Sequence, residues 1–117
     1  MDFDIIKKEG HSVLKVLSSK LDTNNAPALK SELVVLGNEN EKNIILDLSQ
    51  CKFVDSSGLS AILVANRLCE DAIGTFILCG LQPAVEDLVH ISMLHTVLLI
   101  TKTVEEAEQL LERKGNK

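Results

Sequence analysis

Three short aliphatic runs, separated by segments with helical spacing, constrain the fold of this chain most strongly. The runs are NIILDL at 43–48, TFILC at 75–79 and VLLI at 97–100. Strands of a parallel sheet are covered on both faces, so they read as nearly continuous apolar stretches. Such strands alternating with helices predict a mainly parallel sheet with right-handed crossovers.

The start of the chain predicts an antiparallel hairpin. Two apolar-rich segments, Phe3 to Lys8 and Ser12 to Leu17, flank Glu9-Gly10, and glycine supplies the backbone conformation that a tight turn needs. We therefore expect an α/β fold with a mixed, mostly parallel sheet of four to five strands, an N-terminal hairpin and about four helices. At 117 residues the chain is about one domain long, which predicts a single domain over residues 1–117.

The helices are predicted from caps and from apolar spacing. The first follows the cap residues Thr23-Asn24-Asn25 and ends at Gly37, with Pro27 in its first turn and a buried face of Ala26, Leu29, Leu33 and Leu36. The others run from Ser57 to about Glu70, from Pro83 to about His90 and from Val104 to Arg113. In the last helix, Thr103 and Glu106 predict a capping box, and Val104, Ala107, Leu110 and Leu111 predict the buried stripe.

Composition excludes several classes of function. With 45% apolar and 25% charged residues the chain is of ordinary globular type, and its net charge of −5 argues against a nucleic-acid partner. Cys51, Cys69 and Cys79 are odd in number and lack C-x-x-C spacing, so neither a disulfide framework nor a zinc site is indicated. Cys69 and Cys79 are expected to be buried thiols. No signal peptide or membrane span is predicted, and a reducing cytoplasm fits best.

The stretch Asp55-Ser56-Ser57-Gly58 carries the strongest chemical signal, because it opens a helix after a strand. Unpaired backbone N–H groups and the helix dipole at such a place favour added negative charge, although a serine there can also act only as a cap. The buried face of this helix is predicted to consist of Ala61, Ile62, Ala65, Leu68 and Cys69. Leu59, Leu63 and Val64 fall outside it, so they either form a docking surface or pack against neighbouring helices.

Competing sites have weaker support. A serine nucleophile would need a base from His11, His90 or His95, and the G-x-S-x-G elbow is absent. A phospho-aspartate receiver could use Asp47 and Lys102, but the first strand lacks the acidic pair that would hold magnesium. We expect the Asp47 carboxylate to be satisfied by nearby backbone instead. His90 and His95 are five apart and should not share a helix face, so no metal or cofactor site is predicted.

The residues LDLSQCKFVDSSGLSAIL resemble the D-S-[ST]-G-[LM] segment of STAS domains, and they are most similar to bacterial anti-sigma factor antagonists. The resemblance continues through Leu21-Asp22, Gly74, Cys79-Gly80, Pro83-Ala84-Val85 and the segment from Val104 to Leu111. It implies a mixed sheet flanked by helices, in a single STAS-like domain. It also implies that the second hydroxyl residue of the motif, Ser57, is the one that is phosphorylated.

The resemblance further implies a switch rather than an enzyme. An unmodified antagonist of this family binds an anti-sigma factor, often a serine kinase, and so releases a sigma factor. Phosphorylation ends the binding, and a serine phosphatase restores it. ATP and magnesium belong to the kinase, so the chain itself needs no cofactor. The residues expected to bind the partner are Asp22, Asp55, Ser56, Ser57, Gly58, Leu59 and Leu63.

Two further expectations follow from the resemblance. Phosphate would add about −1.5 to −2 charges beside Asp55 and near Asp22, at a site that we expect to be acidic already. Ser18-Ser19-Lys20 lacks the glycine that many relatives have before this aspartate, so the chain is expected to bend differently there. The alternative function is a STAS module that binds a small ligand or serves lipid or anion transport without a phospho-switch. The intact serine pair favours the switch.

Overall fold

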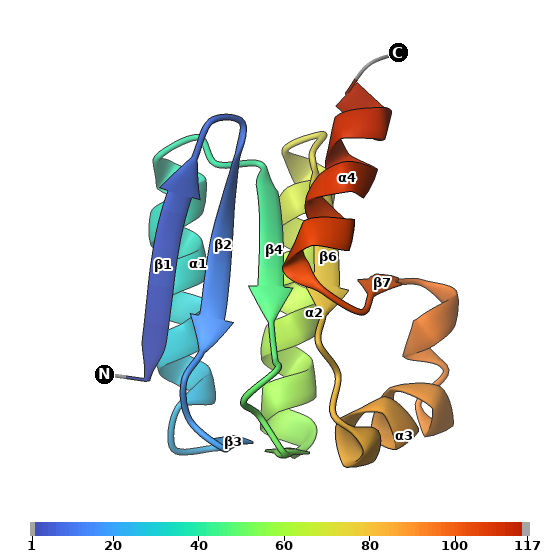
Figure 1. Ribbon diagram of the computed structural model, residues 1–117. Helices are drawn as coiled ribbons and strands as arrows, with labels where there is room; N and C mark the ends of the chain where they lie inside the picture. The colour runs from blue at the N-terminus through green and yellow to red at the C-terminus, as the bar shows by residue number, and fades with distance from the viewer. Residues whose placement is uncertain (1, 116–117) are drawn as a thin grey trace.

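A five-stranded sheet forms the centre of the computed structural model, which describes residues 2–115 (Figure 1). Its order is β1 (Phe3–Lys8), β2 (His11–Val16), β4 (Asn43–Asp47), β6 (Thr75–Cys79) and β7 (Leu99–Thr101). The pair β1–β2 is antiparallel and the other three pairs are parallel. The predicted fold class is therefore confirmed. Met1 and residues 116–117 lie outside the described residues.

The predicted hairpin at the start of the chain is confirmed as well. Lys8 pairs with His11 and Phe3 with Val16, so the loop consists of Glu9 and Gly10 alone. Gly10 has a φ of 88°, in the left-handed region that glycine enters without a steric penalty. The turn therefore fixes the register of both strands.

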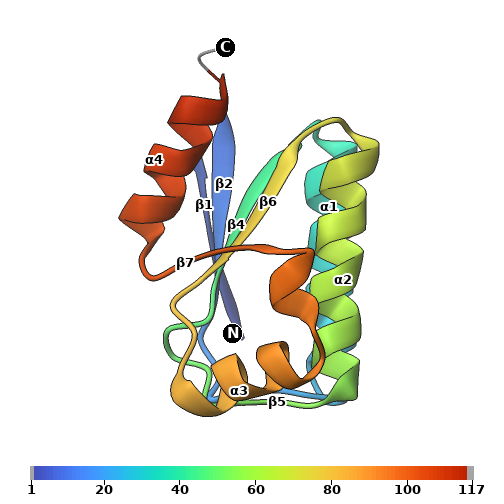
Figure 2. The same cartoon turned by 90° about the vertical axis from the view of Figure 1, so that its right-hand side faces the viewer.

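Helices cover both faces of the sheet (Figure 2). One face carries α1 (Ala26–Asn38) and α2 (Ser56–Asp71), and the other carries α4 (Val104–Gly115). The helix α3 (Pro83–Ile91) and the short 3-10 helix η1 (Leu94–Thr96) lie near one end of the sheet. The predicted buried face of α1, namely Ala26, Leu29, Leu33 and Leu36, is confirmed.

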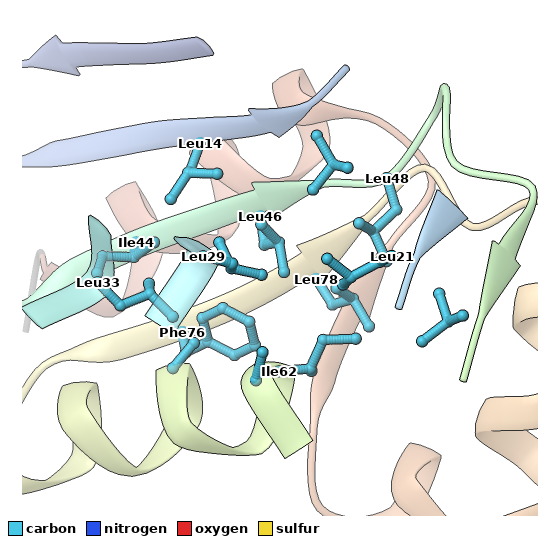
Figure 3. Close-up of a cluster of buried hydrophobic side chains, with 14 of the residues drawn as sticks. Leu14, Leu21, Leu29, Leu33, Ile44, Leu46, Leu48, Ile62, Phe76 and Leu78 are labelled. Carbon is cyan, nitrogen blue, oxygen red and sulfur yellow. The ribbon is translucent and has the colours of Figure 1, made fainter. Parts of the chain in front are cut away.

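Rows of residues that run across three strands explain why the aliphatic runs are continuous. Leu14, Leu46 and Leu78 are register partners and belong to the larger core, between the sheet and the α1–α2 layer (Figure 3). The next row, formed by Val13, Ile45 and Ile77, faces the other way and packs with Ala107 of α4. Because successive residues of a strand point to opposite faces, both rows must be apolar when both faces are covered.

The last strand differs from its prediction. β7 runs from Leu99 to Thr101, whereas VLLI predicted a strand over 97–100. Met93 has a positive φ of 62° and starts a reversal into η1, after which the N–H groups of Val97 and Leu98 both donate to the carbonyl of Leu94. These N–H groups are used by the turn, so the strand begins later.

One of the two hydrogen bonds of the capping box predicted for α4 is present, and the other is shifted. The N–H of Glu106 donates to Thr103 Oγ1 at 3.1 Å, which satisfies one of the free donors of the first turn. The Glu106 carboxylate, however, accepts from the N–H of Lys102 at 3.0 Å rather than from that of Thr103. The reciprocal bond of the capping box is therefore shifted by one residue.

Two short strands were missed by the sequence patterns. β3 (Lys20–Leu21) and β5 (Phe53–Val54) form a second, parallel two-stranded sheet. Each has only two residues, too few for an alternation to be recognised. This small sheet joins the segment before α1 to the segment before α2, and so it positions the serine pair.

Candidate functional site

The start of α2 lies at the carboxyl ends of the parallel strands, beside the small β3–β5 sheet (Figure 1). β5 leads directly into the helix through Asp55, whose N–H donates to the carbonyl of Leu21 on β3 at 3.2 Å. Lys52 and Phe53 donate to the carbonyl of Ser19 at 2.7 and 3.1 Å. These bonds bring Asp22, which follows β3, to the same end of the molecule as the serine pair.

Asp55 caps α2, and the serines do not. Its Oδ1 accepts a hydrogen bond from the N–H of Gly58 at 3.0 Å. Within residues 2–115, neither serine hydroxyl of the pair makes a hydrogen bond, and the backbone N–H groups of Ser56 and Ser57 have no acceptor. Ser56 is exposed and Ser57 is half-buried. Both hydroxyls are therefore free for chemistry or for contact with a partner.

Gly58 fixes the first turn of α2 against the small sheet. A Cβ atom at this position would lie 2.5 Å from the carbonyl oxygen of Leu21 and 2.7 Å from Cγ1 of Val54. Such distances are shorter than van der Waals contact, so only glycine permits this close approach. Gly58 is buried and offers no side chain to a partner, but it sets the position of the serines before it.

Asp22 sits in a hydrogen-bonded turn that leads into α1. Its Oδ1 accepts from the N–H of Asn24 at 3.0 Å, and its carbonyl accepts from the N–H of Ala26 at 2.7 Å. The buried Asn25 side chain accepts from the N–H of Asp22 at 2.9 Å and donates to the carbonyl of Lys20 at 2.8 Å. Asn25 is thus at the N-cap position of α1, yet its side chain ties α1 to β3 instead of capping the helix.

Two grooves flank the serines. The one that we call the serine groove has a volume of about 490 Å³ and lies between α1 and α2. It is lined by Thr23, Ala26, Pro27, Lys30, Ser56, Ser57 and Ser60. The second, which we call the leucine groove, has a volume of about 360 Å³ and is lined by Ser56, Leu59, Ser60, Leu63, Val64 and Arg67. Ser56 and Ser60 line both and form the ridge between them.

Asp55 and Asp22 lie at this end of the molecule as expected, but among residues 2–115 no acidic residue lines either groove. The charged residues that line them are Lys30 in the serine groove and Arg67 in the leucine groove. Both come from positions outside the predicted buried faces of α1 and α2. Lys30 directly follows Leu29 of the buried stripe of α1, so a helical projection would have placed it at the border of that stripe. Ser60 was missed in the same way, and Thr23 was predicted only as a cap residue of α1 and not as a residue of the site.

The apolar residues of α2 divide between core and surface. Leu63 is 40% exposed, as expected for a docking surface, and Val64 is half-buried. Leu59 is partly buried and packs against the main core, which is the second of the two alternatives that the sequence left open for it. The reason is that Leu59 lies in the first turn, where the β3–β5 sheet and the main core meet the helix. Leu59 still lines the leucine groove with part of its side chain.

The histidines are placed away from the serines. His11 Nε2 lies 2.9 Å from Glu108 Oε2, and hydrogen bonds from Lys8 and His11 lower the pKa of the Glu108 carboxyl. His90 and His95 share no helix face, as expected, since they lie on α3 and η1. Their rings nevertheless stack with centroids 4.2 Å apart, because the turn at Met93 folds the chain back. Among residues 2–115, no histidine lines either groove beside the serines, so no base for a serine nucleophile is at hand.

The remaining candidate groups behave as structural residues. Asp47 Oδ1 accepts from the N–H of Ser49 at 2.9 Å, which confirms the prediction of a carboxylate satisfied by backbone. The three cysteines are buried, and burial raises the pKa of Cys69 and of Cys79 to about 12. In the part of the chain that the structure describes, no three histidine, cysteine or acidic residues gather as a metal site would require. None of the helices there has the length and apolar character of a transmembrane span.

The sequence profile of the STAS domain matches residues 2–107, which include both sheets, α1 to α3 and the serine pair. The chain belongs to the STAS domain family. Its curated relatives include BtrV of Bordetella bronchiseptica, described as a candidate anti-sigma factor antagonist. BtrV is 25% identical over 95 residues, which are 81% of this chain and 82% of that protein.

Solved structures share this STAS fold. A candidate anti-sigma factor antagonist from Thermotoga maritima superposes with a TM-score of 0.85 at 23% identity, over 94% of each chain. The anti-sigma factor antagonist SpoIIAA, in its unphosphorylated form, gives a TM-score of 0.73 at 19% identity over 98% and 99% of the two chains. The Bacillus cell fate determinant SpoIIAA in its phosphorylated form gives a TM-score of 0.72 at 22% identity, over 92% of this chain and 96% of that chain.

Proposed function

We propose that this chain is a phosphorylation-controlled protein-binding switch of the anti-sigma factor antagonist type, acting as one STAS domain over residues 1–117. Its unmodified form binds an anti-sigma factor serine kinase in the cytoplasm, and the sigma factor is released. Phosphorylation of Ser57 ends the binding, and a serine phosphatase reverses it. The chain is then a substrate and not an enzyme, and ATP and magnesium are bound by the kinase.

The observation that carries this proposal is the free hydroxyl of Ser57. Because Asp55 supplies the cap, the serine is not required for the start of α2. It lines an open groove, next to a second groove that presents the exposed Leu63. The likeness to SpoIIAA, which is known in phosphorylated and unphosphorylated forms, supports the same chemistry here.

Phosphate at Ser57 should leave the fold intact and weaken the contact with the partner. The free N–H groups of the first turn of α2 favour an anion, by up to about 2 kcal/mol when partly buried. A partner surface shaped for a hydroxyl would instead meet a desolvated dianion. On this proposal Ser56, Ser57 and Leu63 contact the partner, Asp22 and part of Leu59 border the contact, and Asp55 and Gly58 hold its shape.

Phosphorylation itself tests the proposal. The chain is incubated with ATP, magnesium and a candidate serine kinase encoded by a neighbouring gene, and its intact mass is followed. We expect the mass of one phosphoryl group to be added, and peptide mapping to place it on Ser57. The variant Ser57→Ala should stay unmodified. Modification elsewhere, or of the Ala variant equally, would contradict the proposal, and the alternative STAS module without a phospho-switch would be favoured.

The two leucines of the leucine groove should respond differently to polar substitution. Leu63→Gln is expected to weaken binding of the kinase about tenfold, because an exposed apolar contact is lost, with an unchanged melting temperature. Leu59→Gln should lower the melting temperature as well, since Leu59 packs against the core. Calorimetric titration and thermal unfolding of each variant provide the comparison. A lowered melting temperature for Leu63→Gln would show that this residue is structural.

A further inference from the structure

Lys30 lies on α1, across the serine groove from the start of α2. It lines the same groove as Ser57, and so does the Thr23 side chain. Lys30 is half-buried, and among residues 2–115 it makes no ion pair. Among the described residues, Lys30 is thus a cation without an ion-pair partner at the wall of a groove that Ser57 also lines.

The other charged groups near the first turn of α2 do not offer Lys30 a partner. Asp55 comes from the β5–α2 junction and its Oδ1 binds the N–H of Gly58. Asp22 comes from the β3–α1 junction and its Oδ1 binds the N–H of Asn24. Arg67 lines the leucine groove, on the other side of the ridge. A phosphate on Ser57 would thus meet one cation in its own groove, together with the free N–H groups of Ser56 and Ser57.

We propose that Lys30 binds the phosphate of phosphorylated Ser57, so that the modified side chain is held in the serine groove against α1. The inference rests on the proposed function, because it assigns the counter-ion of the same modification. An ammonium group is a good ligand for a phosphate dianion, and a partly buried pair is screened less by solvent than an exposed one. Lys30 then has a role only in the phosphorylated state, as a positioning residue for the phosphate.

The experiment uses the full chain with phosphoserine introduced at position 57 by translational incorporation, so that no kinase is needed. The phosphorus NMR signal is titrated between about pH 4 and 8, because phosphoserine loses its second proton near pH 6. A nearby cation favours the dianion. Lys30→Met should therefore move the midpoint to higher pH, by about 0.4 pH unit, and Lys30→Arg should restore it.

Lys15→Met is the matched control. This substitution removes the same charge as Lys30→Met. Lys15 lies on β2 between two residues of the main core, so it is on the opposite face of the sheet, and it does not line the serine groove. Its midpoint should equal that of the parent chain, and the effect of Lys30→Met should shrink in high salt. Equal midpoints for Lys30→Met and the parent chain would overturn the inference. Because the phosphoserine is incorporated directly, this result is independent of whether a cellular kinase modifies Ser57.

Discussion

Ser57→Asp is expected to weaken binding to the anti-sigma factor serine kinase by about a hundredfold, a cost of about 3 kcal/mol. A carboxylate at this position places a charge where the unmodified interface accommodates a small hydroxyl. Like-charge contact and desolvation then oppose the complex. The fold should tolerate the change, because the added charge lies at the N-terminus of α2. Calorimetric titration against the partner measures the effect.

Two further variants complete this comparison. Ser57→Ala should bind as tightly as the parent chain and should remain bound when ATP is added, since it cannot be phosphorylated. Ser92→Asp adds the same charge at an exposed serine after α3, outside both grooves, and should leave the affinity unchanged. If Ser57→Asp and Ser57→Ala bound equally tightly, charge at Ser57 would not control the interface.

Gly58→Ala should lower the free energy of unfolding by about 2 to 3 kcal/mol, which is roughly a 10 °C decrease in melting temperature. The added methyl group would lie 2.5 Å from the Leu21 carbonyl oxygen, so β3 or α2 must move. This cost exceeds the gain of up to about 1 kcal/mol that alanine normally brings to a helix. Urea unfolding followed by far-UV circular dichroism is the suitable measurement, since the chain has no tryptophan or tyrosine.

Gly37→Ala is the matched control for this prediction. Gly37 also lies within a helix, but a Cβ atom there would meet nothing within 4 Å. The same substitution should therefore stabilise the chain by about 0.5 to 1 kcal/mol. Unchanged stability of Gly58→Ala would mean that the start of α2 is not held tightly against the small sheet.

The main sheet could be predicted from sequence because its strands are covered on both faces. Ile44 to Leu46 and Phe76 to Leu78 are apolar in both alternating rows, a pattern that surface segments do not show. The β3–β5 sheet could not be predicted, since its strands contain two residues each and depend on contacts between distant segments. The strand that VLLI predicted over 97–100 begins only at Leu99, for a related reason. The N–H groups of Val97 and Leu98 donate within the turn that follows Met93, and no residue type in the sequence predicts that turn.

The site was predicted in part. The position of the serine pair at the start of a helix followed from the strand before it and from the apolar spacing after it. The choice of Asp55 rather than a serine as the cap depends on side-chain geometry, which spacing alone does not determine. Lys30 could not be linked to Ser57 from sequence, because their proximity results from the packing of α1 beside α2.

The measurement that tests the central claim most directly compares one preparation of the chain in two states. The chain is phosphorylated on Ser57, half of it is treated with a serine phosphatase, and both halves are titrated calorimetrically against the anti-sigma factor kinase in the absence of ATP. The account predicts tight binding by the dephosphorylated half and about a hundredfold weaker binding by the phosphorylated half. Equal affinities of the two halves would contradict it.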